Sequence, residues 1–148
     1  MVRIFLAGIM QGSLEEEGLH PQDYRGRIKE LFSRHVPEAQ VYCPVENHPK
    51  SLGYSHRQGR QVFFDHLEMA ASCDVLLAFV PEASMGTAVE MWEAFRNGRV
   101  VLTVSALKTN WTVKFLSTHI VKDLDELGSF LETGGLDRLL EASRQKWD

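Results

Sequence analysis

The sequence lacks several features that would define its class at once. Its 148 residues include only two cysteines, Cys43 and Cys73, both in apolar contexts and without the spacing of a metal site. This excludes a disulfide framework but not a single disulfide, and we expect two buried thiols in a reducing cytoplasm. No apolar run approaches the roughly 20 residues needed to cross a bilayer, which argues against a membrane protein.

The sequence predicts no signal peptide and has no excess of positive charge. The apolar run Val2 to Gly8 is too short for a signal peptide, and no basic stretch precedes it. Sixteen Lys and Arg against twenty Asp and Glu give a net charge of -4, which argues against a nucleic-acid partner. No two histidines have a metal spacing, and no metal or organic cofactor is implied. With 44% hydrophobic residues, residues 1–148 suit one folded domain.

Apolar runs and helical patterns alternate along the chain. Short apolar runs predict buried strands, whereas apolar residues at helical spacing predict helices. In the helix predicted at 86–97, the face with Trp92 and Phe95 is expected in the core, and Gly98 is expected to close the helix. Residues 44–60 are expected to form a long irregular loop. Strands are predicted at 2–8, 40–43, 74–80 and 100–104 with a segment near 115–120, and helices at 24–35, 61–72, 86–97 and once or twice before the C-terminus.

Strands that alternate with helices predict an α/β fold. We expect a doubly wound sheet of about five parallel strands between two layers of helices. The flavodoxin-like, Rossmann-like strand order 2-1-3-4-5 makes the first and third strands neighbours. The loops that follow them, 8–13 and 81–86, then flank one crevice, and the ligand site is expected there.

The first of these loops contains candidate anion ligands. It reads Gly8-Ile9-Met10-Gln11-Gly12-Ser13 and offers backbone N–H groups directly after a strand. It is neither a Walker A motif nor a full G-x-G-x-x-G. A glycine that simply ends the strand explains the same residues, so the loop alone does not decide between the two.

A carboxylate lies where the second loop enters a helix. Thr87-x-x-Glu90 fits a capping box, in which the Glu90 side chain bonds the Thr87 amide. A glutamate near a helix N-terminus is also held anionic by the helix dipole, which suits a nucleophile. The spacing leaves both open and favours the cap. Asp65, on the preceding helix, is either a solvated charge or a third group of the site.

Four segments together carry a family resemblance. They are Phe-Leu-Ala-Gly at the end of the first strand, Tyr24-Arg25 opening a helix, Asp74-Val-Leu-Leu-Ala, and Ser84-x-Gly86-Thr87-x-x-Glu90. From about Val2 to Ser117 the chain resembles the nucleoside 2-deoxyribosyltransferase family. In that family the last glutamate attacks the anomeric carbon and forms a covalent glycosyl-enzyme intermediate. The resemblance therefore implies that Glu90 is the nucleophile.

Within this family the chain resembles the nucleoside 5′-monophosphate N-glycosidases more than the transferases. The transferases have an Asp six residues before the nucleophile, whereas the glycosidases have a phosphate-binding Ser there, as this chain does at Ser84. A second Ser of the glycosidases comes from a neighbouring subunit, which implies a homodimer or higher oligomer and a role for Ser117. Their loop Arg is replaced by Met10-Gln11, so backbone N–H groups, Ser13 and Ser84 would hold the phosphate.

The resemblance leaves the acid open. The family's Asp on the helix before the third strand falls on His66 without a gap and on Asp65 with one inserted residue. We favour Asp65, with His66 as the alternative proton donor. Tyr24 and Gly86 are implied substrate contacts, although a Tyr at a helix start also packs at core edges. The chemistry resembles retaining glycoside hydrolysis with a base as the leaving group, and water or a second base resolves the intermediate.

Other functions remain open from the sequence. A phosphoribohydrolase family shares Gly-Thr-x-x-Glu, but Glu82-Ala83 replaces its paired glycines. A dinucleotide such as NAD is a further substrate hypothesis. A nucleotide-binding domain without catalysis is the non-enzyme alternative, since a fold alone never proves an activity, and such a domain needs no nucleophilic Glu90.

Overall fold

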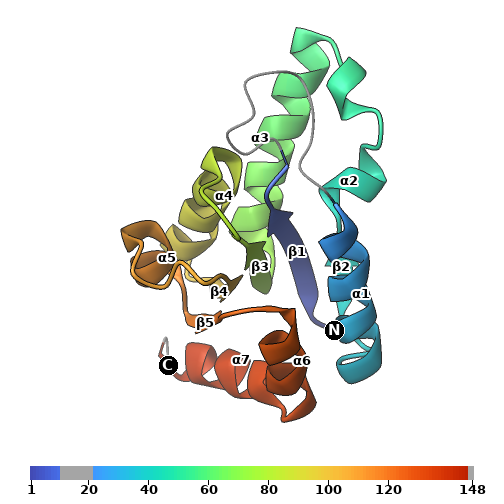
Figure 1. Ribbon diagram of the computed structural model, residues 1–148. Helices are drawn as coiled ribbons and strands as arrows, with labels where there is room; N and C mark the ends of the chain where they lie inside the picture. Colours follow the sequence, from blue (N-terminus) through green and yellow to red (C-terminus); the bar gives the residue numbers. More distant parts are fainter. Residues whose placement is uncertain (11–21, 147–148) are drawn as a thin grey trace.

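The computed structural model describes residues 1–10 and 22–146. Strands and helices alternate along the chain, as the sequence predicts (Figure 1). In chain order the elements are β1 (Arg3–Gly8), α1 (Asp23–His35), β2 (Gln40–Tyr42), α2 (Pro44–Asn47), the short 3₁₀ turn η1 (Ser51–Gly53), α3 (His56–Ser72), β3 (Val75–Phe79), α4 (Met85–Arg96), β4 (Val100–Val104), α5 (Trp111–Leu116), β5 (His119–Val121), α6 (Leu124–Glu132) and α7 (Gly135–Gln145).

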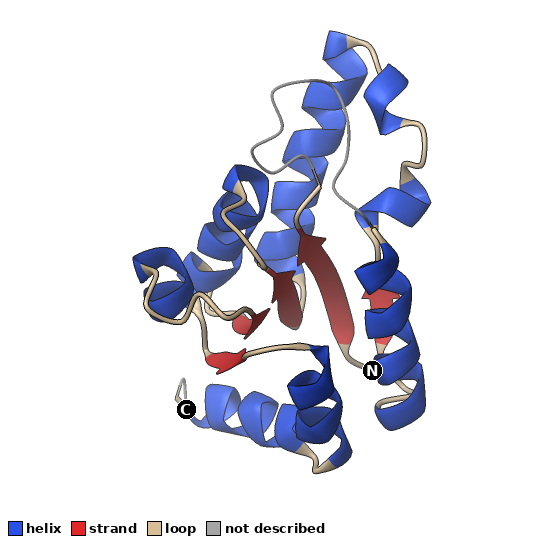
Figure 2. Ribbon diagram, in the orientation of Figure 1, coloured by secondary structure: helices blue, strands red, loops and turns tan. Residues whose placement is uncertain are grey.

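The five strands form one parallel sheet in the order β2-β1-β3-β4-β5 (Figure 2). This confirms the flavodoxin-like order predicted from the sequence. β1 and β3 pair from Ile4 opposite Val75 to Gly8 opposite Phe79. Because both strands end at the same edge of the sheet, the segments that follow Gly8 and Phe79 lie next to each other.

Helices cover both faces of the sheet, which confirms the three-layer arrangement. α1, α6 and α7 pack on one face, together with Ile4 and Leu6 of β1. α3, α4 and α5 pack on the other face, together with Phe5 and Ala7 of the same strand. Successive strand residues point to opposite faces. Because both faces are covered, the strands are continuous apolar runs rather than alternating ones.

Residues 44–60 are more regular than predicted. They form α2, η1 and the beginning of α3, which starts at His56 rather than at Gln61. A capping box begins α3: Ser55 Oγ accepts a hydrogen bond from the Gln58 amide at 3.2 Å, and Gln58 Oε1 accepts one from the Ser55 amide at 3.1 Å. This end of α3 extends beyond the sheet (Figure 1) and is mostly exposed, so its residues carry no apolar periodicity.

The second half of the chain follows the prediction closely. Gly98 has a φ of 71° just after the end of α4, the left-handed conformation expected of a glycine that closes a helix. The segment predicted near residues 115–120 contains the end of α5 and the beginning of β5. Two helices, α6 and α7, follow it and pack against each other.

Both cysteines are buried, free thiols, as predicted. Cys43 precedes α2 and Cys73 follows α3. Across residues 1–10 and 22–146, no helix combines the length and apolar character needed to cross a membrane. The same residues contain no group of three or more His, Cys, Asp or Glu side chains placed to hold a metal ion.

Candidate active site

A cavity of about 300 Å³ lies at the carboxyl edge of the sheet, in the predicted crevice. This volume is at the lower end of the roughly 300–1,000 Å³ typical of small-ligand sites. The cavity brings together five of the predicted site residues, from β1, α3 and the start of α4. Its complete lining is Gly8, Met10, Ser51, Leu52, Phe63, His66, Leu67, Ser84, Met85, Gly86, Thr87 and Glu90.

Other predicted site residues do not line this cavity. Asp65 is directed elsewhere, and its Oδ1 accepts a hydrogen bond from Gln61 Nε2 at 2.8 Å. Ser117 lies at the end of α5, where its hydroxyl bonds the Thr103 hydroxyl at 2.6 Å. Three residues predicted to bind phosphate lie outside the described part of the chain: Gln11, Gly12 and Ser13.

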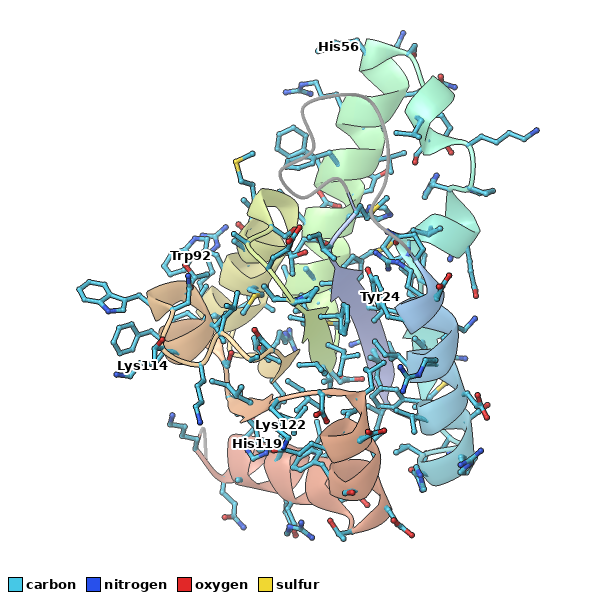
Figure 3. The ribbon with its side chains drawn as sticks, in the orientation of Figure 1. Tyr24, His56, Trp92, Lys114, His119 and Lys122 are labelled. Atoms are coloured by element: carbon cyan, nitrogen blue, oxygen red, sulfur yellow. The ribbon has the colours of Figure 1, made fainter. Side chains whose placement is uncertain are left out.

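Tyr24 does not line the cavity, but it packs against Gly8, which does. Its hydroxyl donates to the carbonyl of Ile9 at 2.9 Å, and its ring stacks on Phe79 at 4.1 Å between centroids. The side chain lies beside β1 (Figure 3), so close to Gly8 that a Cβ there would approach the ring carbons to 2.8 Å. A glycine is therefore required at this position for close packing; the sequence had left open an anion-binding turn or a glycine that ends the strand.

Ser84 is the residue that caps α4. Its Oγ accepts a hydrogen bond from the Thr87 amide at 3.4 Å and contacts the Thr87 hydroxyl at 2.9 Å. The helix therefore begins at Met85, and the predicted capping box between Thr87 and Glu90 is wrong. Because Ser84 occupies the cap, Thr87 is buried in the first turn and Glu90 lies one turn further along the helix.

Glu90 is the acidic side chain of the cavity. Burial raises the pKa of its carboxyl from the ordinary value of 4.5 to about 8, and the positive charge of Arg25 opposes part of this rise. The sequence predicted the opposite effect, an anion held by the helix N-terminus. The loss of water outweighs the helix dipole because Glu90 lies in the second turn, and the dipole acts mainly within the first.

Arg25 is a functional candidate that the sequence did not single out. It is only 4% exposed. Its guanidinium donates to Gln22 Oε1 at 2.7 Å, to the Gly8 carbonyl at 3.2 Å and to the Leu6 carbonyl at 3.3 Å. Within the described residues no carboxylate forms an ion pair with it, and its charge favours the ionised form of Glu90. In the sequence, Arg25 follows Tyr24 at a predicted helix start. This position alone does not show whether the arginine is buried or exposed.

Of the two candidate acids, His66 lines the cavity and Asp65 does not. The His66 Nε2 atom lies 3.1 Å from the Tyr42 hydroxyl, and its ring centre lies 5.3 Å from that of His48. Burial, followed by the charge of His48, lowers the pKa of His66 from 6.5 to about 4. His66 is therefore a neutral imidazole at pH 7. From the sequence, His48 was expected in the long loop of residues 44–60 and Tyr42 in a strand, and neither was among the predicted site residues.

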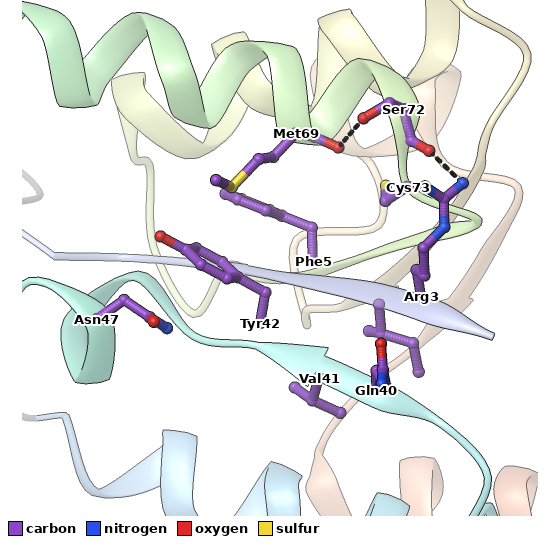
Figure 4. A pocket seen from close by; sticks show the side chains of 10 residues that line it. Arg3, Phe5, Gln40, Val41, Tyr42, Asn47, Met69, Ser72 and Cys73 are labelled. Atoms are coloured by element: carbon purple, nitrogen blue, oxygen red, sulfur yellow. Dashed lines mark hydrogen bonds between the residues drawn. The ribbon is translucent and has the colours of Figure 1, made fainter. Parts of the chain in front are cut away.

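A larger cavity lies elsewhere. It measures about 550 Å³ and lies between β1, the edge strand β2 and the end of α3 (Figure 4). Its walls include Phe5 and Gln40, together with Ser72 and Cys73 at the end of α3. It holds neither Glu90 nor any other predicted site residue. The smaller cavity, at the carboxyl edge, is therefore the better candidate site.

Exposed apolar side chains lie on α3, α4 and α5, and together they are called the apolar surface here. Trp92 and Phe95 were predicted to lie in the core, but they are 50% and 47% exposed, and their rings stack on each other. Trp92 lies on the outer side of the helix layer (Figure 3). The prediction was wrong because helical spacing shows that the residues share a face, but not whether the chain itself covers it. The other exposed members are Phe63, Phe64, Val89, Trp111 and Phe115.

Comparisons with known proteins detect similarity in structure rather than in sequence. No protein-family model matches the chain, and no curated protein sequence matches it. Several solved structures do. A conserved protein from Enterococcus faecalis V583 is 19% identical with a TM-score of 0.64, and the alignment covers 90% of this chain and 98% of that one.

Two enzymes share the fold. A 2-deoxyribosyltransferase from Bacillus psychrosaccharolyticus is 18% identical with a TM-score of 0.66, over 85% of this chain and 90% of that one. The CMP N-glycosidase BcmB from Clostridium botulinum is 20% identical with a TM-score of 0.51, over 88% and 98% of the two chains. At identities of 20% or less, these similarities establish that the chain shares their fold.

Proposed function

We propose that this chain is an enzyme of the nucleoside 2-deoxyribosyltransferase kind, which cleaves the N-glycosidic bond of a nucleoside 5′-monophosphate. The observation that carries the proposal is the position of Glu90, a half-buried carboxylate in a small cavity at the carboxyl edge of the sheet. The motif around Glu90 resembles that of the family. A 2-deoxyribosyltransferase and a CMP N-glycosidase among the structures with the same fold support the same chemistry.

The proposed reaction has two steps. In the first, the Glu90 carboxylate attacks C1′ of the sugar, and the electron pair of the C1′–N bond leaves with the base. In the second, water attacks C1′ of the glycosyl ester and regenerates the carboxylate. The raised pKa of Glu90 makes the ionised carboxylate a stronger nucleophile, but it also means that Glu90 must lose a proton before it attacks.

Ser84 and the start of α4 are proposed to bind the 5′-phosphate. Helix N-termini favour anions because their first N–H groups lack partners within the helix. Ser84 lies at that end of the cavity, and a Cβ at Gly86 would meet no atom within 4 Å, so a ligand has room beside the helix backbone. Because Met10-Gln11 replaces the Arg of the glycosidases, Ser13 and the backbone N–H groups of the loop that contains Gln11 and Gly12 are proposed to bind the same phosphate.

A second copy of the chain is proposed to cover the apolar surface of α3, α4 and α5. Exposed apolar patches of this kind mark protein interfaces. Phe63 belongs to both the surface and the wall of the cavity. A partner on this surface would therefore complete the site, as the family resemblance implies. Ser117 is proposed to act on the site of the neighbouring subunit, because its own copy of the cavity does not include it.

The test is chromatographic. The purified protein is incubated with nucleosides, their 5′-monophosphates and NAD, with and without an acceptor base, and free base is measured. We expect base release from a monophosphate, abolished in Glu90→Gln and retained in Glu93→Gln, which changes an acid one turn further along α4. Exchange that requires an acceptor base would make the protein a transferase instead. No release from any compound by the folded wild type would contradict the proposal and favour a binding role.

A further inference from the structure

His66 makes a specific contact outside the cavity it lines. Its Nε2 atom lies 3.1 Å from the hydroxyl of Tyr42, which rises from β2 towards α3 (Figure 4). Their rings meet edge-on at 5.6 Å between centroids. Within the described residues Nδ1 of His66 has no hydrogen-bond partner, and no buried side-chain nitrogen or oxygen is left unsatisfied. The Nδ1 atom is therefore accessible, on a side chain that lines the cavity.

The contact with Tyr42 bears on which nitrogen of His66 carries the proton. A phenol hydroxyl always has a proton to donate, and Nε2 of His66 is its hydrogen-bond partner in the described structure. Burial raises the pKa of Tyr42, so the hydroxyl keeps its proton. A neutral imidazole has one donor and one acceptor nitrogen. If Nε2 accepts from Tyr42, the imidazole proton must lie on Nδ1.

The surroundings of His66 keep its ring neutral. Five ionisable groups surround it, four from other parts of the chain and one, Asp65, from α3 itself. Burial lowers the pKa of His66 first, and the charges of His48 and Arg25 lower it further, whereas Asp65 raises it. His48 is itself held by the Tyr54 hydroxyl, 2.8 Å from its Nδ1. The five groups are Tyr42 of β2, His48 after α2, Asp65 of α3, Arg25 of α1 and Glu90 of α4.

We propose that Tyr42 is a positioning residue that holds His66 as the neutral Nδ1–H tautomer, and that this N–H group donates a hydrogen bond to the departing base. This inference rests on the proposed function. When the C1′–N bond breaks, its electron pair goes to the base, and the Nδ1–H group stabilises the negative charge without losing its proton. The base anion then takes a proton from water, and the resulting hydroxide attacks C1′ of the ester with Glu90.

This role makes His66 important only for bases that leave with negative charge. Guanine in guanosine 5′-monophosphate leaves as an anion, whereas 7-methylguanosine 5′-monophosphate carries a positive base that leaves neutral. Loss of the His66 hydrogen bond should therefore slow the first substrate much more than the second. Loss of Glu90 should slow both, because attack on C1′ is common to them.

The experiment combines spectroscopy with kinetics. In protein labelled with ¹⁵N-histidine, with His66 assigned by comparison with His66→Asn, we expect Nδ1 protonated and Nε2 unprotonated in the wild type. Tyr42→Phe should populate both tautomers and lower kcat for guanosine 5′-monophosphate about tenfold, the effect of one hydrogen bond. KM should be little changed, and the loss should be under about threefold for the 7-methyl substrate.

Tyr54→Phe is the matched control, since it removes a hydroxyl that bonds His48 rather than His66. It should leave the tautomer of His66 and the ratio of the two rates unchanged. A wild-type His66 protonated at Nε2, or equal losses for both substrates in Tyr42→Phe, would overturn the inference. If the wild type releases no base from either substrate or from any compound of the chromatographic panel above, the proposed function fails, and the spectra alone still decide the tautomer.

Discussion

Replacement of Glu90 by glutamine should stabilise the protein while removing its proposed activity. Burial raises the pKa of Glu90 from 4.5 to about 8, so the folded chain binds this proton more tightly than the unfolded chain does. Between these two pH values the folded state keeps a proton that the unfolded state has lost. The free energy of unfolding therefore falls as pH rises, and the full stability of the protonated form is present only below about pH 4.5.

The size of this effect follows from the width of the pH interval. One protonation site contributes a slope of about 1.4 kcal/mol per pH unit, so the wild type should lose roughly 3 kcal/mol between pH 5 and pH 7 through Glu90. Glutamine has the shape of protonated glutamic acid and does not titrate. The Glu90→Gln variant should thus match the wild type near pH 4.5 and exceed its stability by up to about 3 kcal/mol at pH 7.

Urea unfolding at fixed protein concentration, followed by circular dichroism at pH 5, 6 and 7, measures this difference. Glu93→Gln is the control on the same helix. It removes only the ion pair with Arg96, which is 3.1 Å long and largely exposed on the arginine side, so its effect should stay below about 1 kcal/mol. A difference between Glu90→Gln and the wild type that does not change with pH would refute the argument that burial controls this carboxyl.

Four further results are expected. Ser84→Ala should lower the free energy of unfolding by about 1 kcal/mol through loss of the helix cap. It should also raise KM for a nucleoside monophosphate more than KM for the nucleoside. Equal changes in the two KM values would exclude phosphate binding by Ser84. Gly8→Ala should destabilise the fold by about 1–3 kcal/mol, because the new Cβ would crowd the Tyr24 ring. Gly26→Ala should not, because a Cβ at Gly26 would meet no atom within 4 Å. Similar melting temperatures for the two variants would contradict this. Trp92→Glu should convert an oligomer into a folded, inactive monomer in light scattering, and a monomeric wild type would disprove the proposed assembly. In the wild type kcat/KM should rise with pH up to about 8 as the nucleophile ionises, and a profile flat above pH 6 would argue against that carboxylate.

The architecture of the protein could be predicted from local patterns. The apolar run Val75–Phe79 and the other short runs are long enough for strands and too short for helices, and their alternation with helical patterns leaves few topologies. If the strands are parallel and their connections short and right-handed, few pairing orders remain, and the flavodoxin-like order is one of them. The position of the crevice followed from that order, because strands 1 and 3 become neighbours.

Helix starts were less predictable because several residues compete for the same cap. Ser84 and Thr87 are both good N-cap residues, three positions apart, and the sequence favoured the wrong one. Similarly, α3 begins at the Ser55 cap rather than at the first apolar residue. In both helices the polar cap lies upstream of the apolar face, and hydrophobic periodicity does not reveal it.

The sequence by itself determined the strand order and the motif that contains Glu90. Tertiary structure alone decided what surrounds that carboxyl: Arg25 comes from α1, and burial between elements changes the pKa of Glu90 in the direction opposite to the local prediction. It also determined which of Asp65 and His66 lines the cavity. Neighbouring helix residues point about 100° apart, and the rotation of α3 against the sheet, set by long-range packing, places His66 in the cavity wall and Asp65 outside it.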